Sequence, residues 1–229
     1  MLGAQCTENP PALGSSSAAE AEGHIEEIGG RKAYVTGHHQ DSNLAVLLLS
    51  DAFDKIAASG FLVVAPDFFY GDPFGRGKSR ESWLEAHSPD KGCEDAKIVI
   101  DDLRSKGVSK IGVAGFCWGG KINLRLAKFD CIQAAVLLHP GPITEEEINE
   151  VKIPIAILGA EIDEHAPPEL LQKLGDILSA KAEVDSFVKI FPGVGHGWTV
   201  RYNEGDEFAV KSAQESHLDL LNWLTKYIN

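Results

Sequence analysis

The chain has 229 residues and a formal net charge of −13. A surplus of acidic groups this large argues against nucleic acid and anionic membrane surfaces as partners, because both are bound through basic faces. No apolar run approaches the roughly 18 residues of a membrane span, and residues 1–23 lack the charged and apolar regions of a secretory leader. We therefore expect a cytoplasmic protein without a membrane anchor.

The four cysteines are spread along the chain as Cys6, Cys93, Cys117 and Cys131. They form no C-x-x-C pair and no dense framework, so they predict neither a zinc site nor a disulfide scaffold. Reduced thiols agree with a cytoplasmic location.

The chain begins with a segment of low complexity. Residues 9–23 are rich in Pro, Ser, Ala and Gly, a composition that buries little surface. We therefore predict a flexible arm over residues 1–23 and one domain over residues 24–229, a length that α/β proteins accommodate in a single domain.

The next elements are predicted from periodicity. Two short runs, 24–28 and 32–36, flank Gly29-Gly30 and predict an antiparallel hairpin. Short, mostly apolar runs then predict strands buried on both faces at 44–49, 61–65, 111–114, 134–138, 155–158 and 187–191. Helical segments are expected at 80–87, 94–106, 121–128, 168–178 and 207–228. This alternation predicts a mostly parallel α/β sheet covered by helices on both faces.

The strongest chemical signal is Gly115-Phe116-Cys117-Trp118-Gly119-Gly120, between a predicted strand and a predicted helix. A nucleophile on so sharp a turn needs glycines two residues to either side, because Cβ atoms there would clash. The helix N-terminus would stabilise a thiolate at Cys117, and the N–H of Trp118 could donate to an oxyanion. A buried structural cysteine is the alternative interpretation.

Two later loops supply partners for this cysteine. Asp163 follows one predicted strand and His196, between glycines, follows the next. The chain order of nucleophile, acid and base is that of the α/β-hydrolases, whose catalytic groups lie at the carboxyl ends of the strands. His196 would move protons, and Asp163 would orient its ring. His165 and His139 compete as bases, but His165 is two residues from the acid and His139 precedes a predicted turn.

The sequence resembles the dienelactone hydrolase family, particularly its plant members, from about Tyr34 to the C-terminus. The motifs that carry the resemblance lie at residues 66–69, 71–73, 115–120, 161–163, 167–168 and 195–197. The resemblance implies an α/β-hydrolase fold and a carboxylic ester hydrolase of the carboxymethylenebutenolidase type, acting without cofactor or metal through a Cys-His-Asp triad. The expected partner is a small, often anionic ester or lactone, and the expected assembly is a monomer or weak homodimer.

The resemblance also suggests residues that contact substrate. Asp51 matches a family acidic residue after the third strand, near the resting thiol. Arg80 and Arg201 match the arginines that grip the substrate carboxylate. The second oxyanion donor comes from the loop after the third strand in this fold, where Ala52 or Phe53 stands.

The sequence departs from the family after Phe53, where Asp54 to Gly60 follow at once and a loop and most of a helix are missing. Parallel neighbours normally need a crossover of about a dozen residues or more, so we predict a shortened and marginal crossover. We also predict impaired or altered hydrolysis, because the second oxyanion donor comes from the loop that is shortened. Two alternatives remain open. One is a catalytically impaired binding protein, and the other is an endo-1,3;1,4-β-glucanase, the label of some plant relatives, although no pair of glycosidase carboxylates stands out.

Overall fold

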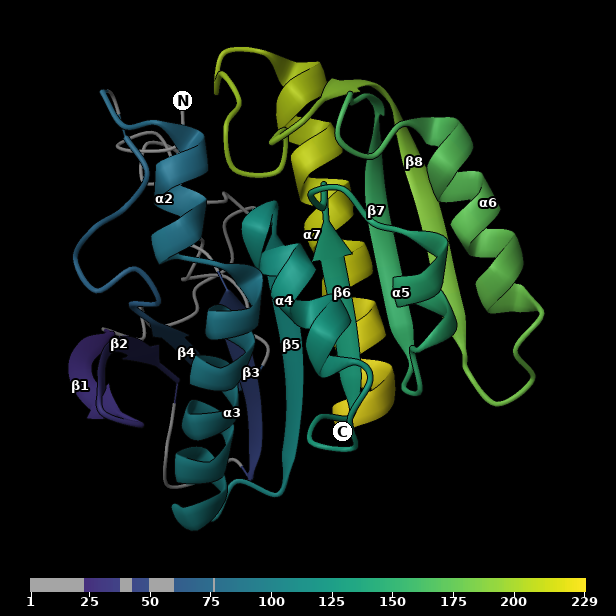
Figure 1. The fold of residues 1–229 in the computed structure, drawn as a ribbon. Coiled ribbons are helices and arrows are strands. Elements are labelled where there is room, and N and C mark those ends of the chain that lie inside the picture. Colours follow the sequence, from purple (N-terminus) through teal and green to yellow (C-terminus); the bar gives the residue numbers. More distant parts are fainter. Residues whose placement is uncertain (1–22, 38–42, 50–59, 76) are drawn as a thin grey trace.

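The computed structural model describes residues 23–37, 43–49, 60–75 and 77–229. The predicted arm over residues 1–23 therefore lies almost entirely outside the described residues. The described chain forms an eight-stranded sheet with helices on both faces, in the order β1-β2-β4-β3-β5-β6-β7-β8 (Figure 1). The strands are β1 (His24–Ile28), β2 (Arg31–Thr36), β3 (Leu44–Leu49), β4 (Leu62–Pro66), β5 (Lys110–Phe116), β6 (Ala134–Leu138), β7 (Ile155–Ile162) and β8 (Ser186–Gly195).

The predicted N-terminal hairpin is confirmed. Strands β1 and β2 pair antiparallel, and Gly29 and Gly30 between them have φ values of 59° and 73°. Two successive residues with positive φ match the turn that follows the natural twist of a hairpin. A Cβ on Gly29 would also lie 3.0 Å from the backbone of Val99, so glycine allows the hairpin to approach the neighbouring helix.

Strands β3 to β8 are parallel to one another, and β2 pairs antiparallel with β4. In β3, Leu47 and Leu49 join one buried cluster, whereas Val46 and Leu48 join another on the opposite face. Both faces of the strand are therefore buried, which explains why it is continuously apolar rather than alternating.

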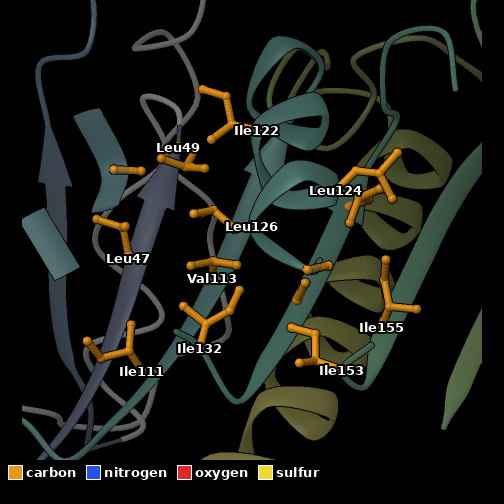
Figure 2. Packing of buried hydrophobic residues seen from close by; sticks show 14 of the residues in the cluster. Leu47, Leu49, Ile111, Val113, Ile122, Leu124, Leu126, Ile132, Ile153 and Ile155 are labelled. Carbon is orange, nitrogen blue, oxygen red and sulfur yellow. The ribbon is translucent and has the colours of Figure 1, made fainter. Parts of the chain in front are cut away.

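The helices are α2 (Arg80–Ala86), α3 (Pro89–Ser105), α4 (Trp118–Leu126), α5 (Glu145–Asn149), α6 (Pro168–Ser179) and α7 (Glu207–Ile228). Helices α3 to α6 contribute side chains to one cluster, and α7 contributes to the other. In Figure 2, Leu126 of α4 lies close to Val113 of β5 within the first cluster. Figure 1 shows α7 on the far side of the sheet. The predicted sheet covered on both faces is confirmed.

Helix α3 begins five residues earlier than the sequence pattern predicts. Its N-cap is Ser88, whose side chain accepts a hydrogen bond from the N–H of Lys91, and Pro89 occupies the first turn. A capping serine followed by proline is a strong helix start, whereas the early residues of α3 are too polar to show an apolar period. The apolar pattern therefore did not reveal where α3 begins.

The crossover after β3 leads to a strand that still pairs normally. Strands β3 and β4 are parallel and in register from Ala45 with Leu62 to Leu47 with Val64. Residues 50–61 connect them, close to the minimum length for a parallel connection. Most of this connection, including Asp51, Ala52 and Phe53, lies outside the described residues. The shortened link is therefore compatible with the parallel pairing.

Among the helices that the structure describes, none has the length and apolar character needed to cross a bilayer.

Candidate active site

Cys117 occupies a strained turn between β5 and α4. Its φ of 50° and ψ of −106° lie outside the regions that residues with a Cβ normally adopt. A Cβ on Gly115 would lie 2.3 Å from the carbonyl oxygen of Gly119, and a Cβ on Gly119 would lie 1.9 Å from that of Leu49. These close approaches leave no room for a Cβ at either position, which explains the predicted need for both glycines. Cys117 itself is half-buried and lies at the start of α4.

The segment after β6 holds the backbone of Cys117 on both sides. The N–H of Cys117 donates to the carbonyl oxygen of Leu138 at 3.1 Å, and its carbonyl oxygen accepts from the N–H of Gly141 at 3.1 Å. These two hydrogen bonds hold the strained turn in place, because a change in the dihedral angles of Cys117 would break them.

Asp163 and His196 meet at the carboxyl edge of the sheet. Strand β7 ends at Ile162 and β8 at Gly195, and these two residues are paired with each other beyond a register shift between Ala160 and Ile162. The residues that follow them therefore lie side by side, with His196 Nδ1 2.7 Å from Asp163 Oδ2. The Asp163 side chain is only 1% exposed. The sequence pattern predicted this meeting, since neighbouring parallel strands end at the same edge.

The surroundings of Asp163 keep it ionised. Burial by itself would raise the pKa of this carboxyl group, but the hydrogen bond with His196 and backbone N–H groups hold the pKa below its ordinary value. One of these donors is the N–H of His165, 2.9 Å from Oδ1. A buried carboxylate held in this way can stabilise a positive imidazole.

The sulfur of Cys117 interacts with the same imidazole. Burial would raise the pKa of the thiol, yet the interaction with His196, followed by the N–H of Trp118 and the charge of Arg201, lowers it. Burial would lower the pKa of His196, but Asp163 and Cys117 raise it to about 9. Both shifts favour a thiolate beside an imidazolium.

The second ring nitrogen of His196 is buried. Within the described chain, Nε2 makes no hydrogen bond of regular geometry. The interaction of His196 with the sulfur of Cys117 is therefore electrostatic. With Nδ1 engaged by Asp163, Nε2 is the nitrogen available to exchange a proton with a reacting group.

The two predicted arginines both act electrostatically on this site. Arg201 donates to the carbonyl oxygen of His196 at 3.2 Å, and its guanidinium lies where a Cβ on Gly197 would sit, 2.0 Å from Nη2. Arg80 starts α2 and is exposed. Burial, His196 and Arg80, in that order, lower the pKa of His165. Both arginines therefore add positive charge near the site, while the role of either arginine in holding a substrate remains a prediction.

The competing histidines are not joined to the acid by their rings. The ring of His165 packs edge-on against that of His196 at 5.0 Å between centroids, and only its backbone N–H reaches Asp163. His139 is buried on another side, 5.1 Å from the ring of His196. The structure thus places His196, rather than either competitor, against the acid.

Aromatic side chains gather beside Trp118, next to the turn. The rings of Phe69 and Trp118 are 4.8 Å apart, and those of Phe69 and Trp83 are 5.1 Å apart. The indole N–H of Trp118 donates to the carbonyl oxygen of His87 at 2.8 Å. This grouping was not predicted, because its members come from the loop after β4, from α2 and from α4. The repeated aromatic residues between 68 and 87 were the available signal.

Two predicted residues cannot be placed. Asp51 and Ala52 lie outside the described residues, so their proximity to Cys117 stays a prediction. Trp118, the other predicted oxyanion donor, is the first residue of α4, and its N–H is among the groups that lower the pKa of the Cys117 thiol. In the part of the chain that the structure describes, no group of three or more acidic, histidine or cysteine side chains is arranged so that it could hold a metal ion.

The sequence is similar to several hydrolases. The model of the dienelactone hydrolase family matches residues 47–228. The chain is 31% identical over 238 residues to the carboxymethylenebutenolidase homolog of Xenopus tropicalis, covering 96% of this chain and 97% of that protein. It is 39% identical over 194 residues to a Zea mays protein named endo-1,3;1,4-beta-D-glucanase, covering 79% of this chain and 63% of the maize protein. The chain thus spans less than two thirds of the maize relative.

Solved structures show the same fold. A Klebsiella pneumoniae protein assigned as a dienelactone hydrolase superimposes with a TM-score of 0.73 at 16% identity, covering 90% of this chain and 99% of that one. An esterase of Pyrococcus furiosus gives a TM-score of 0.64 at 17% identity, with 96% and 100% covered. The fold is that of the α/β-hydrolases, as predicted. With the family match and the Xenopus relative, this shows that the chain is a hydrolase of the dienelactone hydrolase family.

Proposed function

We propose that this hydrolase cleaves a carboxylic ester or lactone of a small molecule, with Cys117 as nucleophile, His196 as proton carrier and Asp163 as its partner. One observation carries the proposal. The imidazole that is held 2.7 Å from a buried carboxylate also interacts with the sulfur on the strained turn, and it lowers the pKa of that thiol. This arrangement activates a cysteine nucleophile without any further group.

The first half of the reaction forms a thioester. The thiolate of Cys117 attacks the carbonyl carbon, and the negative charge moves to the carbonyl oxygen, where the N–H of Trp118 can donate to it. The carbon–oxygen bond to the leaving group then breaks. His196 donates its Nε2 proton to the departing alkoxide, which in a lactone remains tethered to the acyl group.

The second half restores the enzyme. Neutral His196 accepts a proton from water through Nε2 while the water oxygen attacks the thioester carbon. The carbon–sulfur bond breaks, the carboxylic acid is released, and the thiolate and imidazolium form again. Asp163 stays ionised throughout and stabilises the imidazolium in both halves.

The charges around the site support an anionic substrate. Arg201 interacts electrostatically with the thiol, and Arg80 with the neighbouring His165. In a protein with a net charge of −13, local arginines are the means by which a carboxylate-bearing lactone can be attracted. The aromatic group around Trp118 and Phe69, next to the turn at Cys117, offers apolar surface suited to an unsaturated ring.

The test measures turnover of p-nitrophenyl acetate and of a dienelactone by the wild type, Cys117→Ser and Cys117→Ala. Serine is the weaker nucleophile when its base is tuned for a thiolate, so we expect a loss of at least about 10²-fold in kcat/KM for Cys117→Ser and background rates for Cys117→Ala. Wild-type rates in either variant would contradict the proposal.

Two further assays separate the alternatives. A mixed-linkage glucan is assayed with the same proteins, because the maize relative carries a glucanase name. Glucan cleavage that depends on Cys117, without ester turnover, would favour that activity. A stoichiometric burst of p-nitrophenol without further turnover would instead favour a catalytically impaired protein, in line with the shortened crossover after β3.

A further inference from the structure

His139 is the first residue after β6 and lies against the candidate catalytic histidine. Its ring is 5.1 Å from that of His196, with an angle of 67° between the planes. Its Nε2 atom is 2.8 Å from the hydroxyl oxygen of Thr199, which is fully buried. Trp198 closes another side, 5.4 Å from the His139 ring. The imidazole of His196 is thus backed by a second imidazole that is itself held by a hydroxyl group.

The backbone of His139 is held in an unusual conformation. Its φ is 35°, a value that residues with a Cβ seldom adopt, and the residue is only 1% exposed. Its N–H donates to the carbonyl oxygen of Leu158 at 2.8 Å. The same segment holds the backbone of Cys117 through Leu138 and Gly141. Strain of this kind persists where surrounding contacts over-determine the conformation, and it is common at functional sites.

The surroundings of His139 favour its neutral form. The Nδ1 atom is buried and has no hydrogen-bond partner in the described part of the chain, so a ring protonated on both nitrogens would bury an unsatisfied N–H. Burial, followed by the charges of His196 and Arg201 and by His217 of α7, lowers the pKa of His139 well below its ordinary value. The charges of His196, Arg201 and His217 all oppose a second positive charge on the ring.

We propose that His139 is a positioning residue that holds the His196 ring in the orientation needed to pair with the Cys117 thiolate, and that the hydroxyl group of Thr199 fixes His139 for this purpose. A neutral ring at this place packs edge-on against an imidazolium without repelling it. The inference rests on the proposed function, because it assigns His139 and Thr199 to the proton carrier of that reaction.

The physical consequence appears at the sulfur. When the His139 ring is free to turn, the His196 ring loses one wall and its pairing with the thiolate weakens. The thiol pKa then rises toward its ordinary value, and proton transfer to the leaving group becomes slower. Substrate binding is unchanged, because neither His139 nor Thr199 is proposed to contact the substrate.

The test compares Thr199→Val with Thr199→Ser. Valine has nearly the same shape but lacks the hydroxyl group, whereas serine retains it. The first readout is the rate at which iodoacetamide alkylates Cys117 as a function of pH, followed by mass spectrometry of the peptide that contains Cys117. The second readout is kcat and KM for p-nitrophenyl acetate. Circular dichroism confirms that each variant is folded.

For Thr199→Val we expect the midpoint of the alkylation profile to rise by about one pH unit, and kcat to fall about tenfold with little change in KM. Thr199→Ser should behave like the wild type in both readouts. A purely structural role for the hydroxyl group would lower stability without moving the alkylation midpoint. An unmoved midpoint in folded Thr199→Val overturns the proposal.

His139→Asn gives a second test, because asparagine tolerates positive φ but has no ring. We expect the same shift in the alkylation profile, and an unchanged profile in this variant also overturns the proposal. The alkylation readout does not need ester turnover. If the wild type fails to cleave esters while the midpoint still moves, the proposed function fails and the positioning role stands. If ester cleavage depends on Cys117 while the midpoint stays unmoved, the positioning role fails alone.

Discussion

Gly119, in the first turn of α4, lies directly against the carbonyl oxygen of Leu49 at the end of β3. A Cβ on Gly119 would come within 1.9 Å of that oxygen, closer than any real contact allows. This approach brings the start of the helix behind Cys117 up to the strand end whose following loop supplies the second oxyanion donor in this fold. The contact places the start of α4 beside the last residue of β3.

Gly119→Ala should therefore destabilise the protein by about 3 kcal/mol, because the added methyl group meets backbone that cannot move without disturbing β3. Thermal and urea unfolding measure the effect. The matched control is Gly141→Ala, where the nearest atom to an added Cβ is the carbonyl oxygen of Cys117 at 3.8 Å. Equal stability of the two variants would show that the close approach is not a constraint.

The strain at Cys117 predicts an unusual effect of glycine. The free energy of unfolding of Cys117→Gly should equal that of Cys117→Ala or exceed it by up to about 2 kcal/mol. The reason is that glycine adopts φ 50° and ψ −106° without steric penalty, whereas alanine keeps the Cβ. At an ordinary position, glycine would be the less stable of the two. Chemical denaturation compares the two variants, and a Cys117→Gly variant clearly less stable than Cys117→Ala would show that the backbone of Cys117 is not strained.

Asp163→Asn should uncouple the triad. The carboxylate helps to raise the pKa of His196 to about 9, so its removal lowers that pKa and weakens the pairing with the thiolate. We expect kcat to fall by about 10²- to 10⁴-fold, and the midpoint of Cys117 alkylation to rise. NMR titration of the imidazole follows the first effect. A His196 pKa that stays near 9 would argue that the carboxylate is not its partner.

The pH dependence of kcat/KM should be bell-shaped. Below the lowered pKa of Cys117 the thiolate gains a proton and attack stops, so activity falls as the pH decreases through that value. Above about 9, His196 loses the proton that the leaving group needs, so activity falls again. The two limbs belong to the coupled pair rather than to either residue alone. A profile that keeps rising beyond pH 10 would contradict the role of His196 as an acid.

Arg80→Ala tests the preference for anionic substrates. We expect KM for a carboxylate-bearing ester to rise by about tenfold while KM for a neutral ester stays unchanged, since only the former gains from the positive charge. Lys152→Ala is the charge-matched control, because Lys152 is exposed just before β7, at the opposite edge of the sheet from Asp163. Equal effects of the two variants would mean that net charge alone, and not the place of Arg80, attracts the anion.

The sequence by itself determined the architecture and the core of the candidate site. Strands buried on both faces must be continuously apolar, and the runs at β3 and β6 were predicted with the bounds that the structure has. The turn at Cys117 was predictable because glycines two residues to either side are a local requirement of its geometry. Asp163 and His196 were predictable as a pair because parallel strands present their carboxyl ends at one edge.

Only the tertiary structure decided which groups surround that pair. The sequence indicates only that His139 precedes a turn. Nothing near it in the chain indicates that Thr199, sixty residues away, holds its ring. The aromatic group around Trp118 was not predictable from the local sequence either, since its members meet through packing between a loop and two helices. Local patterns encode backbone geometry and burial, whereas the neighbours of a buried ring depend on how distant elements pack, and this packing leaves no periodic trace in the sequence.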